Sequence, residues 1–167
     1  NGVHIRRLAD ADLAGRLIPF LAQAGIAVDT PERRALLLRI IPHIKERTKK
    51  LTDAAPLVDF FFGDIQTPPA EMLIGPKMEQ HLSLYALRET RRLVEAVEPF
   101  EDAPLEQAMR KLGDDLQLKP TQLFTVVRNA VTGKTVTPPL FATMAILGRD
   151  TCLARLDRAI AQLQSGG

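Results

Sequence analysis

Basic side chains in two stretches of the sequence are the residues best suited to bind a ligand. The first group lies at the end of an expected helix and the second around a central turn; their members are Lys45, Arg47, Lys49 and Lys50, and then Lys119, Arg128 and Lys134. Arginine and lysine side chains of this kind bind phosphates and read nucleic-acid bases. Cations at helix ends also interact favourably with the helix dipole, so charge alone does not establish a binding site.

The neighbours of Arg128 favour RNA recognition over a merely solvated surface. Arg128 stands beside Asn129, just before a turn that presents Thr137, Pro138 and Leu140. A planar guanidinium group, a hydroxyl group and apolar side chains suit unstacked RNA bases, which stack on such groups and are read along their edges. We therefore expect a base-binding site at this turn.

No set of residues predicts catalysis. The acidic side chains are scattered along expected helix surfaces, and no histidine is close in sequence to a candidate serine or cysteine. Asp114 and Asp115 are adjacent, but adjacent helical residues point about 100° apart, so we expect both to be solvated. Cys152 lies one residue before the apolar stripe of the last expected helix and is predicted to be a half-buried structural thiol.

A nucleotide-binding loop and a metal site are also disfavoured. Gly133, Lys134 and Thr135 resemble the end of a phosphate-binding loop, but that motif needs a second glycine five positions earlier, where Arg128 stands. The three histidines are far apart in the sequence and have no cysteine beside them. No metal ligand and no cofactor are therefore expected in this chain.

Composition limits the class of protein. Of the 167 residues, 46% are hydrophobic and 25% are charged, which is ordinary for a soluble globular protein. The formal net charge is only +2, so any surface for a polyanion must be a local patch. The single cysteine excludes an internal disulfide and suits a reducing, cytoplasmic compartment. No apolar run approaches the ~18 residues of a membrane span, so no membrane partner is expected.

The start of the sequence suggests a fragment. It has no initiator methionine and no apolar segment of the kind found in signal peptides, and it opens on a stretch that looks structured. We expect the missing part of a longer protein to lie upstream.

Helical periodicity and breaker residues predict an all-α fold. No convincing alternating strand is found, and about eight short to medium helices are expected. A short extended run is expected at residues 3–5, followed by a helix that begins at Asp10 or Asp12 and ends at Gly25.

Two further helices complete the first half. Thr30 should cap a helix that Pro42 kinks or splits. Its expected buried face comprises Leu37, Ile40, Ile41, Ile44 and Leu51. Thr52 or Asp53 should cap a short helix that Gly63 closes.

Residues 64–77 hold the richest run of helix breakers: Pro68, Pro69, Gly75 and Pro76. We interpret this stretch as a boundary between two helical subdomains. The predicted division is a first subdomain at 1–67, a linker at 68–77 and a second subdomain at 78–167, which opens with two amphipathic helices ending near Pro99 and Leu116.

Residues 119–163 are expected to form a helix, a turn and two further helices. Gly133 should stop the first helix, and Thr137 followed by two prolines should start the second. The last helix is expected to bury a stripe of Leu153, Leu156, Ile160 and Leu163. Its solvent-facing side is expected to hold Arg149, Arg155, Asp157 and Arg158.

Several of these segments resemble a known family. Residues 126–133, 137–141, 147–148 and 153–156 are similar to the C-terminal end of bacterial-type glutamyl-tRNA synthetase. Residues 1–6 are similar to that family's entry into the same region, and residues 44–51 and 60–62 also look like the family. The resemblance spans essentially the whole chain, and it is most specific at residues 128–141.

The resemblance implies an anticodon-binding region, built as an all-α cage of two packed helical subdomains. Its partner would be the anticodon loop of glutamate tRNA, with no DNA or membrane partner, and it would act as a monomer in the cytoplasm. The family's enzymes attach glutamate to tRNA with ATP and Mg²⁺, but their ATP-binding signatures are absent from this sequence. This stretch alone is therefore expected to lack enzyme activity.

The resemblance also implies roles for individual residues. Arg47 matches the family's reader of the third anticodon base, a cytosine, whose O2 and N3 acceptors a guanidinium group can contact. Four further residues match the set that holds the first two bases: Arg128, Thr137, Pro138 and Leu140. Arginine rather than glutamine at position 47 favours an enzyme that rejects glutamine tRNA. Asn129 departs from the family's usual small or apolar residue and is expected to face solvent.

Other readings stay open at this point. The chain could come from a paralogous or non-discriminating enzyme of the same family, or from class I lysyl-tRNA synthetase, which has a related helical cage. It could also be a helical protein-interaction module without an RNA partner. RNA binding should weaken linearly on a log-log salt plot, whereas binding through an apolar interface should not.

Overall fold

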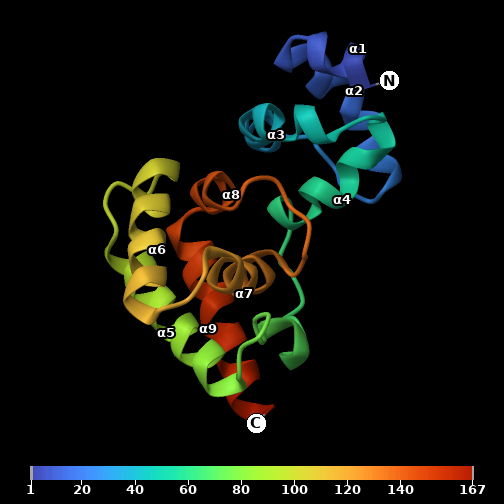
Figure 1. Cartoon of the computed structure of the whole chain (residues 1–167). Coiled ribbons are helices and arrows are strands. Elements are labelled where there is room, and N and C mark those ends of the chain that lie inside the picture. Colours follow the sequence, from blue (N-terminus) through green and yellow to red (C-terminus); the bar gives the residue numbers. More distant parts are fainter. Residues whose placement is uncertain (1, 167) are drawn as a thin grey trace. The chain divides into compact units, whose positions relative to one another are not determined.

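The computed structural model describes residues 2–166, and over that range the chain is all-α (Figure 1). Nine α-helices and four 3-10 helices are found in this part of the chain, without a strand, so the predicted fold class is confirmed. The chain divides into two compact units, Asn1–Asp64 and Ile65–Gly167. Each unit has its own buried apolar residues and is described separately.

The first unit is a small helical bundle around α2 and α3. Its elements are α1 Gly2–Arg7, α2 Asp10–Gln23, α3 Pro31–Ile44, η1 Lys45–Arg47, η2 Leu51–Asp53, α4 Ala54–Val58 and η3 Asp59–Phe61. Helix α2 packs against α3 and α4, and the leucines and isoleucines at their helical spacing are fully buried. Arg33 attaches the start of α3 to the segment after η3, because its Nη2 donates to the Phe62 carbonyl at 2.8 Å.

One expectation for the first unit is confirmed. The Thr30 hydroxyl accepts a hydrogen bond from the Arg33 backbone N–H at 3.1 Å and so caps α3. Pro42 lies inside α3, which continues to Ile44, so the helix is not split at the proline; the chain then continues as the tighter turn η1. Proline removes one helical hydrogen bond, and α3 continues without it for two more residues.

Three other expectations are wrong. Residues 3–5 belong to helix α1 rather than to an extended run, and Ile5 is only 3% exposed because this turn packs on the unit. Leu51 lies in η2, outside the buried face of α3. Asp53 Oδ2 accepts from the Lys50 backbone N–H at 3.0 Å, so Asp53 supports the turn before it and its side chain does not cap α4.

The second unit places α7 among the other helices (Figure 1). Its elements are η4 Ala70–Leu73, α5 Gln80–Ala96, α6 Asp102–Leu116, α7 Pro120–Thr132, α8 Leu140–Leu147 and α9 Arg149–Ser165. Helix α7 packs against α5, α9 and η4, and α5 lies along α9. The buried residues of α7 leave only part of its surface available to solvent.

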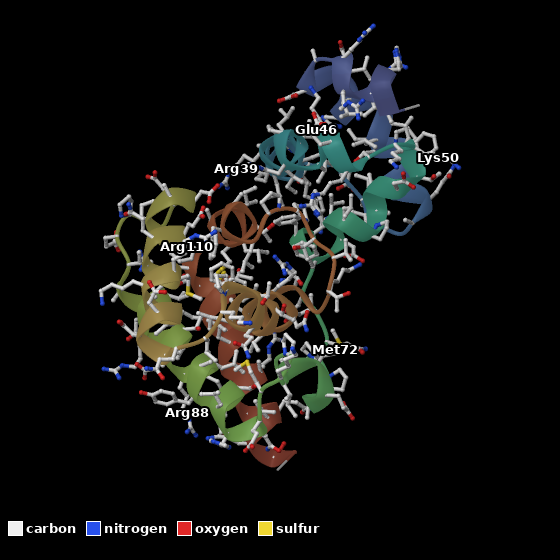
Figure 2. The ribbon with its side chains drawn as sticks, viewed as in Figure 1. Arg39, Glu46, Lys50, Met72, Arg88 and Arg110 are labelled. Atoms are coloured by element: carbon white, nitrogen blue, oxygen red, sulfur yellow. The ribbon has the colours of Figure 1, made fainter. Side chains whose placement is uncertain are left out.

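The stretch predicted to be a linker, 68–77, lies within the second unit. Leu73 is completely buried, and the Met72 carbonyl accepts a hydrogen bond from Asn129 Nδ2 of α7 at 2.8 Å. Figure 2 shows Met72 on the η4 segment. The prolines and Gly75 therefore shape a packed segment, and the units divide between 64 and 65 rather than across 68–77.

Helix α9 buries a different face from the one that its leucine stripe predicted, since Leu153 and Ile160 of the stripe are only half-buried. Its buried residues are Cys152, Arg155, Leu156, Ala159 and Leu163. Arg155, expected on the solvent side, is only 4% exposed, and its Nη1 donates to the Val131 carbonyl of α7 at 2.8 Å. Because α9 contacts α5, α7 and α8, two faces of the helix are covered instead of one.

Gly75 is a position where the fold demands the absence of a side chain. A Cβ there would overlap Met78 Sδ and lie 2.8 Å from Val126 Cγ2 and 3.2 Å from the Gln122 carbonyl oxygen. The backbone is held in place, since the Gly75 N–H donates to Ser83 Oγ at 3.0 Å.

We expect Gly75→Ala to lower the free energy of unfolding by about 1–3 kcal/mol, as overpacking does in a filled core. Urea unfolding followed by circular dichroism measures this. The matched control is Gly15→Ala in α2, where an added Cβ meets nothing within 4 Å; alanine should stabilise that helix by about 0.5–1 kcal/mol. Equal effects of the two substitutions would contradict the packing argument.

Candidate nucleic-acid interface

Arg47 is exposed at the end of η1, where a buried neighbour fixes the backbone. Thr48 is 1% exposed, and its Oγ1 donates to the Ile44 carbonyl at 2.8 Å. The backbone at Thr48 is extended, with φ −100° and ψ 99°. Since side chains alternate along an extended segment, an inward Thr48 places its neighbours Arg47 and Lys49 outward.

Lys45 does not belong to the open basic group that its position in the sequence suggested. Its Nζ donates to Asp10 Oδ1 at 2.8 Å and to the Leu8 carbonyl at 2.6 Å. This ion pair ties η1 to the start of α2, so the charge of Lys45 is largely neutralised inside the unit. The exposed cations of the first group are Arg47, Lys49 and Lys50.

The second basic group is not one patch. Lys119 precedes the first residue of α7 and Lys134 follows its last turn. A helix of 13 residues rises by roughly 20 Å, so these two lysines lie at opposite ends of α7. Of the second group, only Arg128 and Lys134 lie near the turn after α7.

That turn is organised around Thr137. Gly133 ends α7 with φ 72°, a left-handed conformation that glycine adopts without steric cost. Thr137 is 3% exposed; its Oγ1 accepts from Arg128 Nε at 3.1 Å and donates to the Pro138 carbonyl at 2.7 Å. Thr137 therefore does not cap α8, whose N-cap is Pro139; instead it orients the half-buried Arg128 guanidinium group.

Two further residues predicted to contact RNA are buried, as Thr137 is. Pro138 is buried, and Leu140 is 4% exposed and part of the apolar core of the second unit. The exposed apolar residue at this turn is Val136, at 65%. Val136 was not among the predicted contact residues, although its position between two threonines and outside any helical stripe was a signal for exposure.

Asn129 is buried, contrary to the expectation that it faces solvent. It is 5% exposed, and its Nδ2 bonds the Met72 carbonyl, as described above. An amide at this position is explained by the η4 carbonyl that it satisfies.

Cys152 is unsuited to nucleophilic chemistry. It is completely buried, with Sγ 3.6 Å from the Met144 carbonyl, rather than half-buried as expected. Burial raises the pKa of the Cys152 thiol to about 12, and the nearby Arg155 charge opposes the shift only in part. Over residues 2–166, no three histidine, cysteine or acidic side chains are placed to hold a metal ion. In the same range, no helix combines the length and apolarity needed to cross a bilayer.

Comparison with known proteins places the chain in a family. Residues 12–160 match the family model of the anticodon binding domain. A glutamate–tRNA ligase of Roseiflexus castenholzii is 44% identical over 165 residues, which cover 98% of this chain and 32% of that protein. A glutamate–tRNA ligase of Acidothermus cellulolyticus is 43% identical over 175 residues, covering 100% of this chain and 34% of that protein. The chain thus spans about a third of the length of these relatives.

A solved structure has the same fold. The crystal structure of a glutamate tRNA ligase from Elizabethkingia meningosepticum, in complex with its amino acid, superposes with a TM-score of 0.79 at 17% identity. The match covers 98% of this chain and 31% of that one. At this level of identity the likeness concerns the fold alone.

We expect Thr137→Val to lower the free energy of unfolding by about 1–3 kcal/mol, because the variant keeps the shape but leaves buried polar groups without their partner. Thermal and urea unfolding measure the change. Thr135→Val, at an exposed position of the same turn, is the control and should stay within about 0.5 kcal/mol of the parent. Equal stability of the two variants would mean that the Thr137 hydroxyl does not hold the turn.

We expect the Cys152 thiol to resist Ellman's reagent at pH 8, because its raised pKa keeps it protonated and its burial blocks access. The free energy of unfolding should also fall as pH rises from about 9 to 12, because the thiol of the unfolded chain loses its proton in this range while the folded one keeps it. The control is Ser165→Cys, which adds an exposed thiol. In the folded variant we expect the introduced thiol to react fast and Cys152 slowly, and in denaturant both thiols should react fast. A fast native reaction of the parent chain would contradict the burial.

Proposed function

The chain belongs to the anticodon binding domain family, and from that premise we propose that it binds the anticodon loop of glutamate tRNA as part of a glutamate–tRNA ligase. The observation that carries the proposal is the family match over residues 12–160 together with the relatives that share nearly the whole chain. In the complete cytoplasmic enzyme, other regions would use ATP and Mg²⁺ to activate glutamate. This chain would supply tRNA binding rather than catalysis.

Arg47 is proposed to read the third anticodon base. Its side chain is exposed at a turn whose backbone is held by buried Thr48. A guanidinium group has planar donors that suit the O2 and N3 acceptors of cytosine, and guanine presents donors at its corresponding edge. Discrimination against glutamine tRNA would follow from this preference.

Arg128 is proposed to hold the first two anticodon bases. The bond from its Nε to Thr137 leaves the guanidinium plane in a defined orientation, which lowers the entropy lost on binding. The buried Pro138 and Leu140 would support the turn from beneath, whereas the exposed Val136 would offer the apolar surface against which a base stacks.

We expect Arg47→Ala and Arg128→Ala each to weaken binding of a glutamate-tRNA anticodon stem-loop by about 1–3 kcal/mol, the range for a lost charged base contact. Fluorescence anisotropy with the third anticodon base as C and then as G measures this. The parent chain should bind the C form more tightly, and Arg47→Ala should lose that preference.

Arg88→Ala is the matched control, because Arg88 is an exposed arginine on α5 (Figure 2). Its affinity should equal that of the parent chain. If neither Arg47→Ala nor Arg128→Ala changed the affinity, the assignment of these two arginines would fail. Binding that did not depend on salt would instead favour a protein-interaction module.

A further inference from the structure

A pocket of about 390 Å³ lies entirely within the first unit. It is lined by residues of α1 and α2 and by the segment that follows Arg47: His4, Ile5, Leu8, Arg16, Phe20, Lys49, Lys50, Leu51 and Thr52. Its volume falls within the roughly 300–1,000 Å³ of pockets that hold a small ligand group. None of the proposed anticodon-reading residues lines it.

The lining combines apolar and cationic side chains. Ile5, Leu8, Phe20 and Leu51 supply apolar surface, and Arg16, Lys49 and Lys50 supply positive charge. No acidic residue is among the nine that line the pocket. The Asp53 carboxylate supports the segment that carries the lysines: its Oδ2 accepts from the backbone N–H groups of Lys49 and Lys50 at 3.2 and 3.0 Å.

The lysines and Arg16 carry charge that this unit does not neutralise. Ion pairs in the first unit join Arg6 to Glu46 and Lys45 to Asp10, and within residues 2–166 no ion pair is found for Arg16, Lys49 or Lys50. Unpaired cations around an apolar recess attract an anion that also has an apolar face. A nucleotide is such a ligand, because its phosphate is anionic and its base has a π face that stacks on aromatic and apolar side chains.

The pocket continues the proposed RNA surface. Lys49 is two residues after Arg47, and an extended segment advances about 3.3 Å per residue, so their Cα atoms are separated by about 7 Å. Figure 2 shows Lys50 at the periphery of the first unit. A strand with one base at Arg47 would carry its neighbouring phosphates past Lys49 and Lys50.

We propose that this pocket holds one unpaired nucleotide of the bound RNA, next along the strand from the base at Arg47. The base lies against Phe20 and Leu51, and the phosphate lies between Lys49, Lys50 and Arg16. This inference rests on the proposed function and adds a second binding site to it. The pocket reads no base edge, so it contributes affinity rather than anticodon choice.

The charge contacts are tested with Lys49→Gln/Lys50→Gln in the full 167-residue chain. Anisotropy titrations of the anticodon stem-loop between 50 and 200 mM salt give affinity and its salt dependence. Two lost phosphate contacts should make the slope of log K against log salt shallower by about 1.4, at about 0.7 per contact for a single strand. Affinity at the lowest salt should fall about tenfold or more.

The charge-matched control is Lys77→Gln/Arg88→Gln, which removes two exposed cations, one from the turn before α5 and one from α5. It should change affinity by less than about twofold and leave the slope as in the parent chain. A pocket variant with the affinity and slope of the parent overturns the proposal. So does a control that flattens the slope as much as the pocket variant, because the effect would then belong to net charge.

The base contact is tested with Phe20→Leu, which keeps an apolar side chain and removes the aromatic face. Stacking on an aromatic residue is worth enough that its loss should weaken binding about threefold to tenfold, with the salt slope unchanged. Circular dichroism melts check that the variant is folded. If a folded Phe20→Leu chain bound RNA as tightly as the parent, the proposal that a base stacks on Phe20 in this pocket would be contradicted.

The pocket and the proposed anticodon reading fail in different ways. Both pocket variants should keep the preference for C over G at the third anticodon base, whereas Arg47→Ala should lose it. If the parent chain bound the C and G forms equally, the reading of the base by Arg47 would be contradicted. The salt slopes of the parent and of Lys49→Gln/Lys50→Gln would still test whether the pocket binds a phosphate. A parent chain that binds neither form overturns both.

Discussion

The second unit depends on the burial of α7 among α5, α9 and η4. A helix covered on several sides must satisfy its polar groups internally, since a buried unpaired donor or acceptor costs about 1–3 kcal/mol. Two of these groups are satisfied by neighbouring elements: Asn129 Nδ2 donates to the Met72 carbonyl, and the Val131 carbonyl accepts from Arg155. These two bonds attach η4 and α9 to α7. With much of α7 thus enclosed, the half-buried Arg128 and the exposed Val136 of the following turn remain accessible to a partner.

The two proposed RNA-reading arginines share one physical design. Each side chain sits beside a buried threonine whose hydroxyl bonds the backbone, Thr48 to the Ile44 carbonyl and Thr137 to the Pro138 carbonyl. The bond from the threonine hydroxyl to a backbone carbonyl fixes the backbone of a short segment that has no regular helical hydrogen bonds of its own. A cation on such a segment loses little freedom when it binds, and this favours selective contacts over general attraction to phosphate. Lys49 and Lys50, by contrast, are exposed point charges suited to the backbone of RNA.

Charge placement also explains how a nearly neutral chain can meet a polyanion. With a net charge of +2, attraction must come from cations that lack internal partners. Lys45 is not such a cation, since its ion pair with Asp10 neutralises its charge within the first unit. The number of lysines and arginines in a stretch is therefore a poor guide to its binding strength. Which of them are paired decides the local field.

Most helices could be read from the sequence, because periodicity, Thr30, Gly133 and the prolines act through local backbone physics. The family also followed from ordered motifs along the chain. Tertiary packing decided the rest: it buried Arg155 and Asn129, drew 68–77 into the second unit, and turned Thr137 from an expected cap into a partner of Arg128. Local spacing specifies one helix face, whereas burial depends on which neighbours cover the others, and only the folded chain contains that information.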